Sequence, residues 1–397
     1  MGIENVFVVG AGFMGHGIAQ VSALAGYRVT LCDVREEALR AGTENIRSSL
    51  RKLVSKGRVD EERAGRALEL ISTTTELGEA SRADLVIEAV PESLSLKVEV
   101  FRVLDGICPP HALLGTNTSA IPISSLAAAT SRPERVVGVH FFGPVPLMRL
   151  VEIIRGLLTS QETMESADAW ARSLGKETVL VQKDHAGFVA NRVNIPSSME
   201  AVRMVDEGLA TPEEIDRSTG GFEAGVGPLQ IMDNAGLEVA FSAALAIYED
   251  TRDPSFLPPP LLRRMVAAGL LGRKSGRGFY DYASGKRESY MLPAPRRGPG
   301  ERGDSQGLLM RFLLPGILEA IRVVEAGVAE AEDVDRASRL GFNLPMGQLE
   351  MADNLGLDTV LAEASRLYEE TKSPAFLPPP LLRRMVTMGS DLRSSTH

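Results

Sequence analysis

The chain has 397 residues, and its 43 Lys+Arg against 52 Asp+Glu give a formal net charge of −9. Hydrophobic residues make up 44% and charged residues 24%, which excludes a disordered or collagen-like chain. The acidic balance argues against nucleic acid or an anionic membrane as the main partner. No apolar run approaches the roughly 20 residues of a membrane span, and the opening residues do not resemble a signal peptide. With only two cysteines, Cys32 and Cys108, we expect a cytoplasmic enzyme or binding protein without a disulfide framework.

Over the first 185 residues, short apolar runs alternate with longer amphipathic segments. The apolar runs cover residues 6–9, 29–32, 85–87, 113–114 and 136–139, and the clearest amphipathic segment covers 36–54. This alternation predicts a parallel β-sheet covered by helices on both faces. We therefore expect an α/β Rossmann-like domain over residues 1–185.

A glycine-rich turn, GAGFMG at 10–15, follows the first predicted strand and opens the first predicted helix. The three glycines permit a tight turn, close approach to a pyrophosphate and close packing of helix on sheet. Asp33 ends the second predicted strand and can accept hydrogen bonds from both ribose hydroxyls, which favours NAD over NADP, although Arg35 could weaken that preference. The alternative is a structural turn with a solvated aspartate. The residues predicted to bind NAD here are Gly10, Gly12, Phe13, Met14, Gly15 and Asp33.

From residue 186 onward the apolar spacing is helical and no convincing strand is present. FLPPPLLRRMV at 256–266 recurs letter for letter at 376–386. A duplicated unit is therefore expected. The pattern predicts two all-α domains from a tandem duplication, residues 186–285 and a degenerate copy at 309–397, joined by a Pro/Gly-rich linker at 286–308.

Five further motifs stand in fixed order along the chain. They are VIEAVPESLSLK (86–97), NTSAIPI (117–123), VHFFGPVPLMRLVEI (139–153), KDHAGFVANR (183–192) and GRKSGRGFYDY (272–282). Together they resemble the L-3-hydroxyacyl-CoA dehydrogenase family over residues 4–283. The resemblance implies NAD-dependent oxidation of the 3-hydroxyl of an acyl-CoA thioester, or the reverse reduction, in a cleft between the α/β and helical domains.

Oxidation of a secondary alcohol requires a base for the hydroxyl proton while hydride leaves to the nicotinamide. His140 is the best candidate of the five histidines, because it ends an apolar run and histidine exchanges protons near neutral pH. Glu152 in the next apolar run can orient the imidazole and stabilise the imidazolium. In the family, the matching histidine and glutamate form this pair. A buried structural histidine is the alternative.

The resemblance implies roles for other polar residues. Ser119 would hydrogen-bond the substrate 3-oxygen, and Asn117 would lie near the nicotinamide. Asn191 would contact the substrate carbonyl region and the base. Glu92 and Lys97 match positions that contact the nicotinamide half of the cofactor. The alternatives are caps or turns for Ser119, Asn117 and Asn191, and a solvated helix pair for the other two.

Two further positions bear on the substrate. Lys52 belongs to a basic stretch over 47–58 that could contact the phosphates of CoA, where the family places a lysine, or could be a solvated helix face. Gly143 stands where many family members carry Asn and multifunctional relatives often carry Ser, so we expect a changed substrate orientation or preference. No spacing typical of a metal site is present, and hydride transfer to nicotinamide needs no metal.

The second copy is predicted to be catalytically silent, because alignment places Met310 opposite Asn191 and no GRKSGRGFYDY counterpart follows. In single-copy family members the helical domain forms the homodimer interface, and multifunctional β-oxidation proteins carry it duplicated within one chain. We therefore expect the second copy to pack on the first as a pseudo-twofold partner that replaces the homodimer partner.

Two other functions remain open at this point. One is the oxidation of a free 3-hydroxy acid, as in the related gulonate and carnitine dehydrogenases. The other is a crystallin-like NAD-binding protein without activity. The HFFGPVP segment favours the acyl-CoA branch, and the joint presence of His140, Glu152, Ser119 and Asn191 favours an enzyme.

Overall fold

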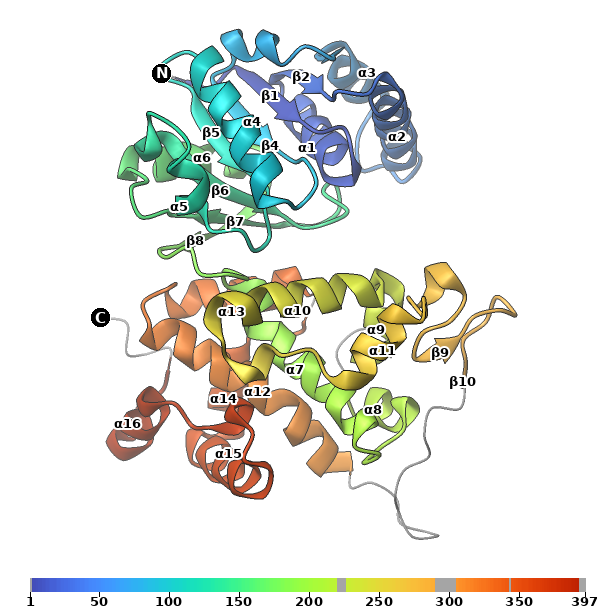
Figure 1. Cartoon of the computed structure of the whole chain (residues 1–397), viewed down its shortest axis with the longest axis vertical. Helices are drawn as coiled ribbons and strands as arrows, with labels where there is room; N and C mark the ends of the chain where they lie inside the picture. Colours follow the sequence, from blue (N-terminus) through green and yellow to red (C-terminus); the bar gives the residue numbers. More distant parts are fainter. Residues whose placement is uncertain (1, 220–225, 290–304, 343, 393–397) are drawn as a thin grey trace. The chain divides into compact units, whose positions relative to one another are not determined.

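The computed structural model describes residues 2–219, 226–289, 305–342 and 344–392. The chain forms two compact units, Met1–Phe188 and Val189–His397 (Figure 1). The first boundary lies three residues beyond the predicted one at 185. The two helical segments predicted as separate domains lie together in the second unit.

An eight-stranded sheet in the order β3-β2-β1-β4-β5-β6-β7-β8 forms the centre of the first unit. Its strands are β1 (Asn5–Val9), β2 (Arg28–Cys32), β3 (Ile71–Thr74), β4 (Leu85–Glu88), β5 (Leu113–Thr116), β6 (Val136–Phe141), β7 (Leu150–Ile154) and β8 (Glu177–Val181). The prediction of a wholly parallel sheet is wrong at one place, because β6 and β7 are antiparallel. The connection between them, residues 142–149, is too short for the crossover that parallel neighbours need.

Helices cover both faces of this sheet (Figure 1), which is why its central strands are buried at every residue instead of at alternate ones. They are α1 (Phe13–Leu24), α2 (Glu36–Ser55), α3 (Glu61–Glu69), α4 (Leu94–Ile107), α5 (Ile123–Ala127) and α6 (Gln161–Ser173). Side-chain caps start two of them: Asp60 accepts from the Arg63 N–H at α3, and Ser160 accepts from the Thr163 N–H at α6. The Rossmann-like prediction for this unit is confirmed.

The second unit is helical. Its helices are α7 (Ala190–Asp206), α8 (Pro212–Thr219), α9 (Pro228–Ala235), α10 (Leu237–Thr251), α11 (Pro260–Ala267), α12 (Ser305–Glu325), α13 (Ala331–Gly341), α14 (Gln348–Leu355), α15 (Leu357–Thr371) and α16 (Pro380–Met388). Two short antiparallel strands, β9 (Tyr280–Asp281) and β10 (Glu288–Ser289), were not predicted. Helix α12 starts within the predicted linker, and the linker residues 290–304 lie outside the described residues.

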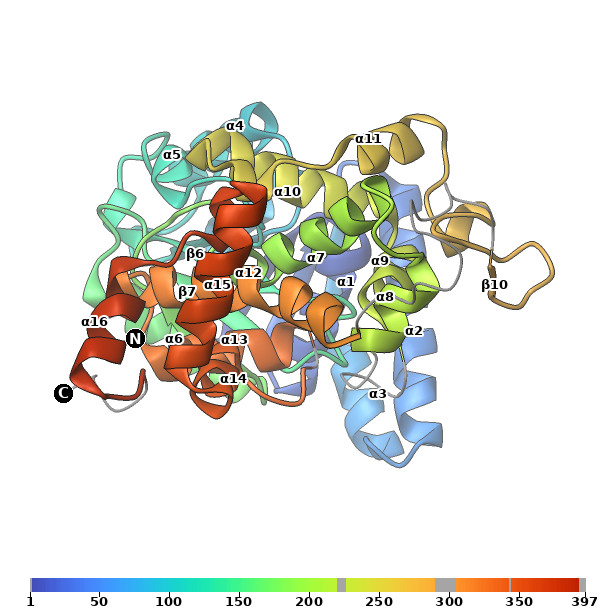
Figure 2. The same cartoon turned by 90° about the horizontal axis from the view of Figure 1, so that it is seen from below.

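Helices α7 and α12 pack side by side in this unit (Figure 2). Two ion pairs cross their interface. Arg192 Nε lies 2.6 Å from Glu319 Oε1, and Arg311 Nε lies 2.6 Å from Glu200 Oε1. Both glutamates are 1% exposed. On each of the two helices, the arginine precedes the glutamate by the same number of residues. The interface is therefore reciprocal, with each helix giving one buried carboxylate and one guanidinium.

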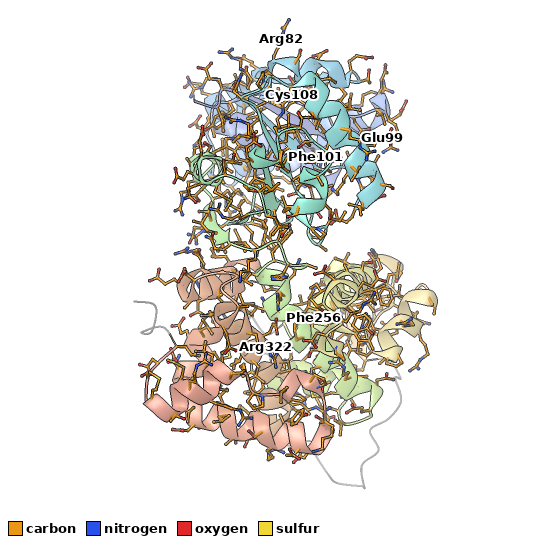
Figure 3. All side chains as sticks on the ribbon, turned by 60° about the vertical axis from the view of Figure 1, so that its left-hand side comes forward. Arg82, Glu99, Phe101, Cys108, Phe256 and Arg322 are labelled. Atoms are coloured by element: carbon orange, nitrogen blue, oxygen red, sulfur yellow. The ribbon has the colours of Figure 1, made fainter. Side chains whose placement is uncertain are left out.

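A second hydrogen-bond pattern occurs once in each half of the unit. Arg203 on α7 donates to the Pro254 carbonyl at 3.2 Å, and Arg322 on α12 donates to the Pro374 carbonyl at 3.3 Å. Figure 3 labels Arg322 and, in the other half, Phe256, which is completely buried. Each arginine thus ties the long helix of its half to the proline-containing segment that follows.

Candidate active site

The glycine turn between β1 and α1 has the backbone geometry that its sequence predicts. Gly10 has φ +102°, and a Cβ there would lie 2.6 Å from the Ala89 carbonyl oxygen. A Cβ on Gly15 would lie 1.7 Å from the Gly10 carbonyl oxygen, whereas a Cβ on Gly12 would meet no atom within 4 Å. The first and third glycines are therefore required by packing, and the second leaves an open cradle beside the backbone.

Asp33 is attached to this turn. Its Oδ2 accepts from the Ala11 N–H and its Oδ1 from the Arg35 N–H, both at 3.0 Å. The Asp33 side chain is only 14% exposed, so the alternative of a solvated aspartate is wrong, whereas the Arg35 side chain is 74% exposed. Phe13 and Met14 follow in the first turn of α1, with the Phe13 ring largely exposed. The turn, the aspartate and the exposed ring lie together at the carboxyl end of β1 and β2.

His140 and Glu152 form a buried pair. The antiparallel register of β6 and β7 places them directly opposite each other, and His140 Nδ1 lies 2.7 Å from Glu152 Oε2. Glu152 is completely buried and His140 is 6% exposed. The rings of Phe142 and Phe188 lie 4.5 and 5.7 Å from the imidazole. Because Nδ1 faces the carboxylate, Nε2 is the atom that can exchange a proton with a substrate.

The turn after β5 carries the predicted polar residues. Asn117 Oδ1 accepts from the Phe141 N–H at 2.9 Å and so links β5 to the strand that carries His140. Glu92 Oε1 accepts from the Ser119 N–H at 3.0 Å and from the Thr118 hydroxyl at 2.5 Å. The Ser119 hydroxyl is 3.5 Å from the same oxygen, at the limit of a hydrogen bond. The backbone of this turn is held firmly, while the Ser119 hydroxyl is held weakly.

Glu92 is charged because of its neighbours. Burial raises the pKa of this carboxyl, but the Lys97 ammonium and hydrogen bonds from Thr118 and Ser119 outweigh burial, so its pKa lies below the usual value. A fixed negative charge therefore stands at the carboxyl end of β5, close to the Ser119 hydroxyl.

Lys97 is not on a solvated helix face, and that alternative is wrong for it. It is 1% exposed, and its Nζ lies 2.7 Å from Glu88 Oε1 and 3.2 Å from Glu92 Oε2. Glu88, at the end of β4, is completely buried and also accepts from the Thr116 hydroxyl at 2.8 Å. Glu88 was not among the predicted site residues, although an acidic residue that closes an apolar run was a signal for it. Lys97 thus affects the site indirectly, because it fixes the position and the charge of Glu92.

The basic side chains of residues 47–58 do not all face the same part of the surface. Lys52, Lys56 and Arg58 line one open hollow together with the Phe13 ring. Arg51 instead pairs with Glu44 on the surface of α2. The positive charge that faces the hollow therefore comes from three of the five basic side chains in the stretch.

The Phe13 side chain packs against the backbone at Gly143. A Cβ on Gly143 would lie 2.4 Å from Phe13 Cε1 and 3.4 Å from Met14 Sδ. The phenylalanine ring thus fills the space that a side chain at position 143 would take. Both residues had been singled out in the sequence, but only the structure pairs them.

Asn191 belongs to the second unit, in the first turn of α7, where it lines an apolar cavity. The two cysteines are free and buried. Within the described ranges, no group of three His, Cys, Asp or Glu side chains is arranged to hold a metal. In the same residues, none of the helices has the length and apolar character needed to cross a membrane.

The carboxyl edge of the first unit's sheet carries an open glycine cradle, an aspartate bound to it and a buried histidine–glutamate pair. This fold and site define a Rossmann-type dehydrogenase that uses a nicotinamide dinucleotide. Sequence comparison makes the assignment specific. The NAD-binding domain of 3-hydroxyacyl-CoA dehydrogenase matches residues 5–185, and the C-terminal domain of the same enzyme matches residues 187–282 and 308–396. The chain belongs to the 3-hydroxyacyl-CoA dehydrogenase family and is an NAD-dependent oxidoreductase.

Individual relatives fall into two groups by coverage. The probable 3-hydroxybutyryl-CoA dehydrogenase of Bacillus subtilis is 46% identical over 283 residues, which cover 71% of this chain and 98% of that protein. The 3-hydroxyadipyl-CoA dehydrogenase of Escherichia coli is 31% identical over 99% of both chains. A crystal structure of 3-hydroxybutyryl-CoA dehydrogenase from Escherichia coli K12 superposes with a TM-score of 0.89 at 31% identity, covering 98% of this chain and 99% of that one. Some relatives thus match nearly the whole chain, and others match about 71% of it.

Proposed function

We propose that this chain oxidises the 3-hydroxyl of an L-3-hydroxyacyl-CoA to the 3-oxoacyl-CoA and catalyses the reverse reduction. The observation that carries this proposal is the buried His140–Glu152 pair, with 2.7 Å between Nδ1 and Oε2. The family and the acyl-CoA names of its relatives support the substrate class. These relatives do not favour either alternative, which are a free 3-hydroxy acid as the substrate and a crystallin-like protein without activity.

In this proposal His140 Nε2 takes the hydroxyl proton during oxidation and returns it during reduction. Glu152 keeps the imidazole in place and stabilises its charged form in a site where little water competes. The open cradle at Gly12 and the carboxylate of Asp33 would hold NAD. When bound, NAD supplies the hydride acceptor.

The remaining polar residues act on the substrate oxygens and the cofactor. The weakly held Ser119 hydroxyl can donate to the 3-oxygen, and Asn191 contacts the carbonyl region. Asn117 and Glu92 would contact the nicotinamide half of the cofactor, with Glu92 placed and charged by Lys97.

The basic hollow beside Phe13 would receive the phosphates of CoA. Lys52 provides one ammonium group there, with Lys56 and Arg58 on the same hollow. A CoA thioester carries a pyrophosphate and a 3′-phosphate, so several cations on one open surface suit it. A free 3-hydroxy acid would make no use of them.

The test follows NADH absorbance with acetoacetyl-CoA for the native protein and for His140→Ala. We expect the variant to lose at least about 100-fold in kcat, the usual scale for a general base. Turnover equal to the native protein would overturn the role of His140. Native turnover of acetoacetate at the rate of acetoacetyl-CoA would overturn the CoA substrate.

We also propose that the helical unit arose by tandem duplication, with copies at 186–285 and 309–397 around a linker at 286–308, after an NAD-binding domain over 1–185. The reciprocal ion pairs between α7 and α12 support this proposal. So does a repeated cap: Asp216 accepts from the Leu229 N–H at 2.9 Å and Asp335 from the Leu349 N–H at 2.7 Å.

The second copy would then take the place of a homodimer partner, because it already covers the α7 face within one chain. Sedimentation equilibrium tests this idea, because it gives the mass of the assembly in solution. We expect that any assembly it detects does not depend on the α7 face. A dimer that dissociates when Arg192 is changed to Met would contradict the replacement, since Arg192 is engaged within the chain.

A further inference from the structure

Three charged side chains, Glu88, Lys97 and Glu92, form a connected group near the carboxyl ends of β4 and β5, which we call the charge triad. Glu88 Oε1 accepts from the Lys97 ammonium and from the Val90 N–H, both at 2.7 Å. Its Oε2 accepts from the Thr116 hydroxyl at 2.8 Å. All three of these neighbours donate to the carboxyl, which is the pattern expected for an ionised carboxylate.

The Lys97 ammonium is held by more than Glu88. It also lies 3.2 Å from Glu92 Oε2 and donates to the Val90 carbonyl at 3.2 Å. Three acceptors match the three N–H groups of an ammonium, so this cation has a fixed position. Glu88 is completely buried, and it holds the cation that in turn holds Glu92. With two carboxylates and one ammonium, the net charge of the triad is −1.

The strand order indicates which part of a dinucleotide would lie near this charge. From β1 the sheet extends through β2 to β3 on one side and through β4 to β5 and β6 on the other. In open sheets of this kind a dinucleotide lies across the point where the order reverses, with one nucleotide on each side. Asp33, which follows β2, belongs to the adenosine side. The nicotinamide side is therefore the one that carries the triad and, farther along, His140 on β6.

We propose that the charge triad raises the affinity for NAD+ relative to that for NADH, with the buried Glu88 as a positioning residue. The inference rests on the proposed placement of the nicotinamide half and adds discrimination between the two oxidation states of the cofactor. The nicotinamide ring is positively charged in NAD+ and neutral in NADH, whereas both forms share the same phosphates and riboses. A fixed negative charge near the ring therefore stabilises the oxidised form selectively. Glu88 acts through Lys97 and Glu92.

Calorimetric titration of the full-length protein with NAD+ and with NADH gives two dissociation constants and their ratio. Glu88→Gln keeps the shape of the buried side chain and leaves a neutral triad, in which Lys97 balances Glu92. A unit charge about 10 Å away, at an effective dielectric constant near 20, changes the affinity for a cation about tenfold. We therefore expect Glu88→Gln to weaken the binding of NAD+ relative to NADH at least about fivefold.

The double variant Glu88→Gln, Lys97→Met separates charge from structure. It removes one charge of each sign, so the net charge returns to −1 although both buried partners are altered. We expect its ratio of dissociation constants to lie within about twofold of the native ratio. A merely structural role for Glu88 would instead disturb the double variant at least as much as the single one.

Glu99→Gln is the matched control. It makes the same chemical change on α4, the helix that carries Lys97, but Glu99 is exposed to solvent (Figure 3). Water and salt screen an exposed charge, so the native ratio should be retained. Equal ratios in the native protein and in folded Glu88→Gln would overturn the proposal. A double variant shifted as far as the single one would overturn it as well.

Glu92→Gln also makes the triad neutral, without altering a buried side chain, and carries the test should Glu88→Gln fail to fold. It should shift the ratio in the same direction, and an unchanged ratio would overturn the proposal. Cofactor binding requires no substrate, so these outcomes are independent of the proposed oxidation of an acyl-CoA. Failure of the native protein to bind either form of the cofactor would instead overturn the proposed cofactor site.

Discussion

Replacing Glu152 by glutamine tests how His140 is supported. The change is isosteric, so the completely buried side chain leaves no void, and its carbonyl oxygen can still accept from the imidazole. What disappears is the negative charge facing the ring. Glu152→Gln therefore separates electrostatic stabilisation of the imidazolium from simple orientation of the ring.

The magnitude follows from the geometry. Nδ1 and Oε2 are 2.7 Å apart, which puts the two charge centres about 4 Å apart when the imidazole is protonated. At an effective dielectric constant near 20, their attraction is about 4 kcal/mol. During oxidation of the alcohol the charged imidazole forms as the hydroxyl proton is transferred, so most of this loss appears in kcat, as a decrease of about 100- to 1,000-fold.

Steady-state formation of NADH from L-3-hydroxybutyryl-CoA provides the assay, because it follows the oxidation direction, with KM expected to change little. Asp168→Asn is the matched control, because it removes a carboxylate that pairs with Arg172 on α6, at a site with no proposed role in the chemistry. Circular dichroism should show both variants folded. A decrease in kcat of less than tenfold in folded Glu152→Gln would refute the electrostatic role and leave orientation alone.

Three further outcomes are expected. Lys97→Met leaves Glu88 buried without its cation and should cost about 3–5 kcal/mol in urea unfolding, and a loss below about 1 kcal/mol would contradict the pairing. Gly143→Asn should lower kcat/KM by forcing the Phe13 ring to move, and adding Phe13→Ala should restore part of the loss; strictly additive effects would show that the two sites are uncoupled. Burial lowers the pKa of Lys176 to about 8, so the unfolded chain binds its proton more tightly and the native state gains stability as pH rises from 8 toward 10. The stability of the native protein relative to Lys176→Met, measured by denaturant unfolding, should therefore increase over that range by about 2 kcal/mol, and a flat difference would refute it.

The features that the sequence predicted depend on neighbours along the chain or on strand register. Gly10 is required by its positive φ and Gly15 by a contact with the Gly10 carbonyl within the same turn, so their spacing indicates the cradle. The His140–Glu152 pair was also within reach, because two consecutive apolar runs with a short connection place residues opposite each other. In each case the residues concerned are close in the sequence, so their spacing is enough to predict the feature.

Other features were decided only by the tertiary structure. The sequence left Lys97 open as a solvated helix residue, but burial beside Glu88 makes it part of an ion pair under the site. The contact between Phe13 and Gly143 joins positions far apart in the chain.

The cavity in the helical unit has the same origin. The repeat in the sequence predicted two similar helical halves, but not that α7 and α12 would pack through reciprocal ion pairs and leave apolar space lined by both. Composition and periodicity specify which faces are apolar, whereas the volume between faces depends on how side chains of distant helices interdigitate. The sequence alone therefore predicted the pairing of His140 with Glu152, whereas the lining of the cavity was decided by how the two helical halves pack.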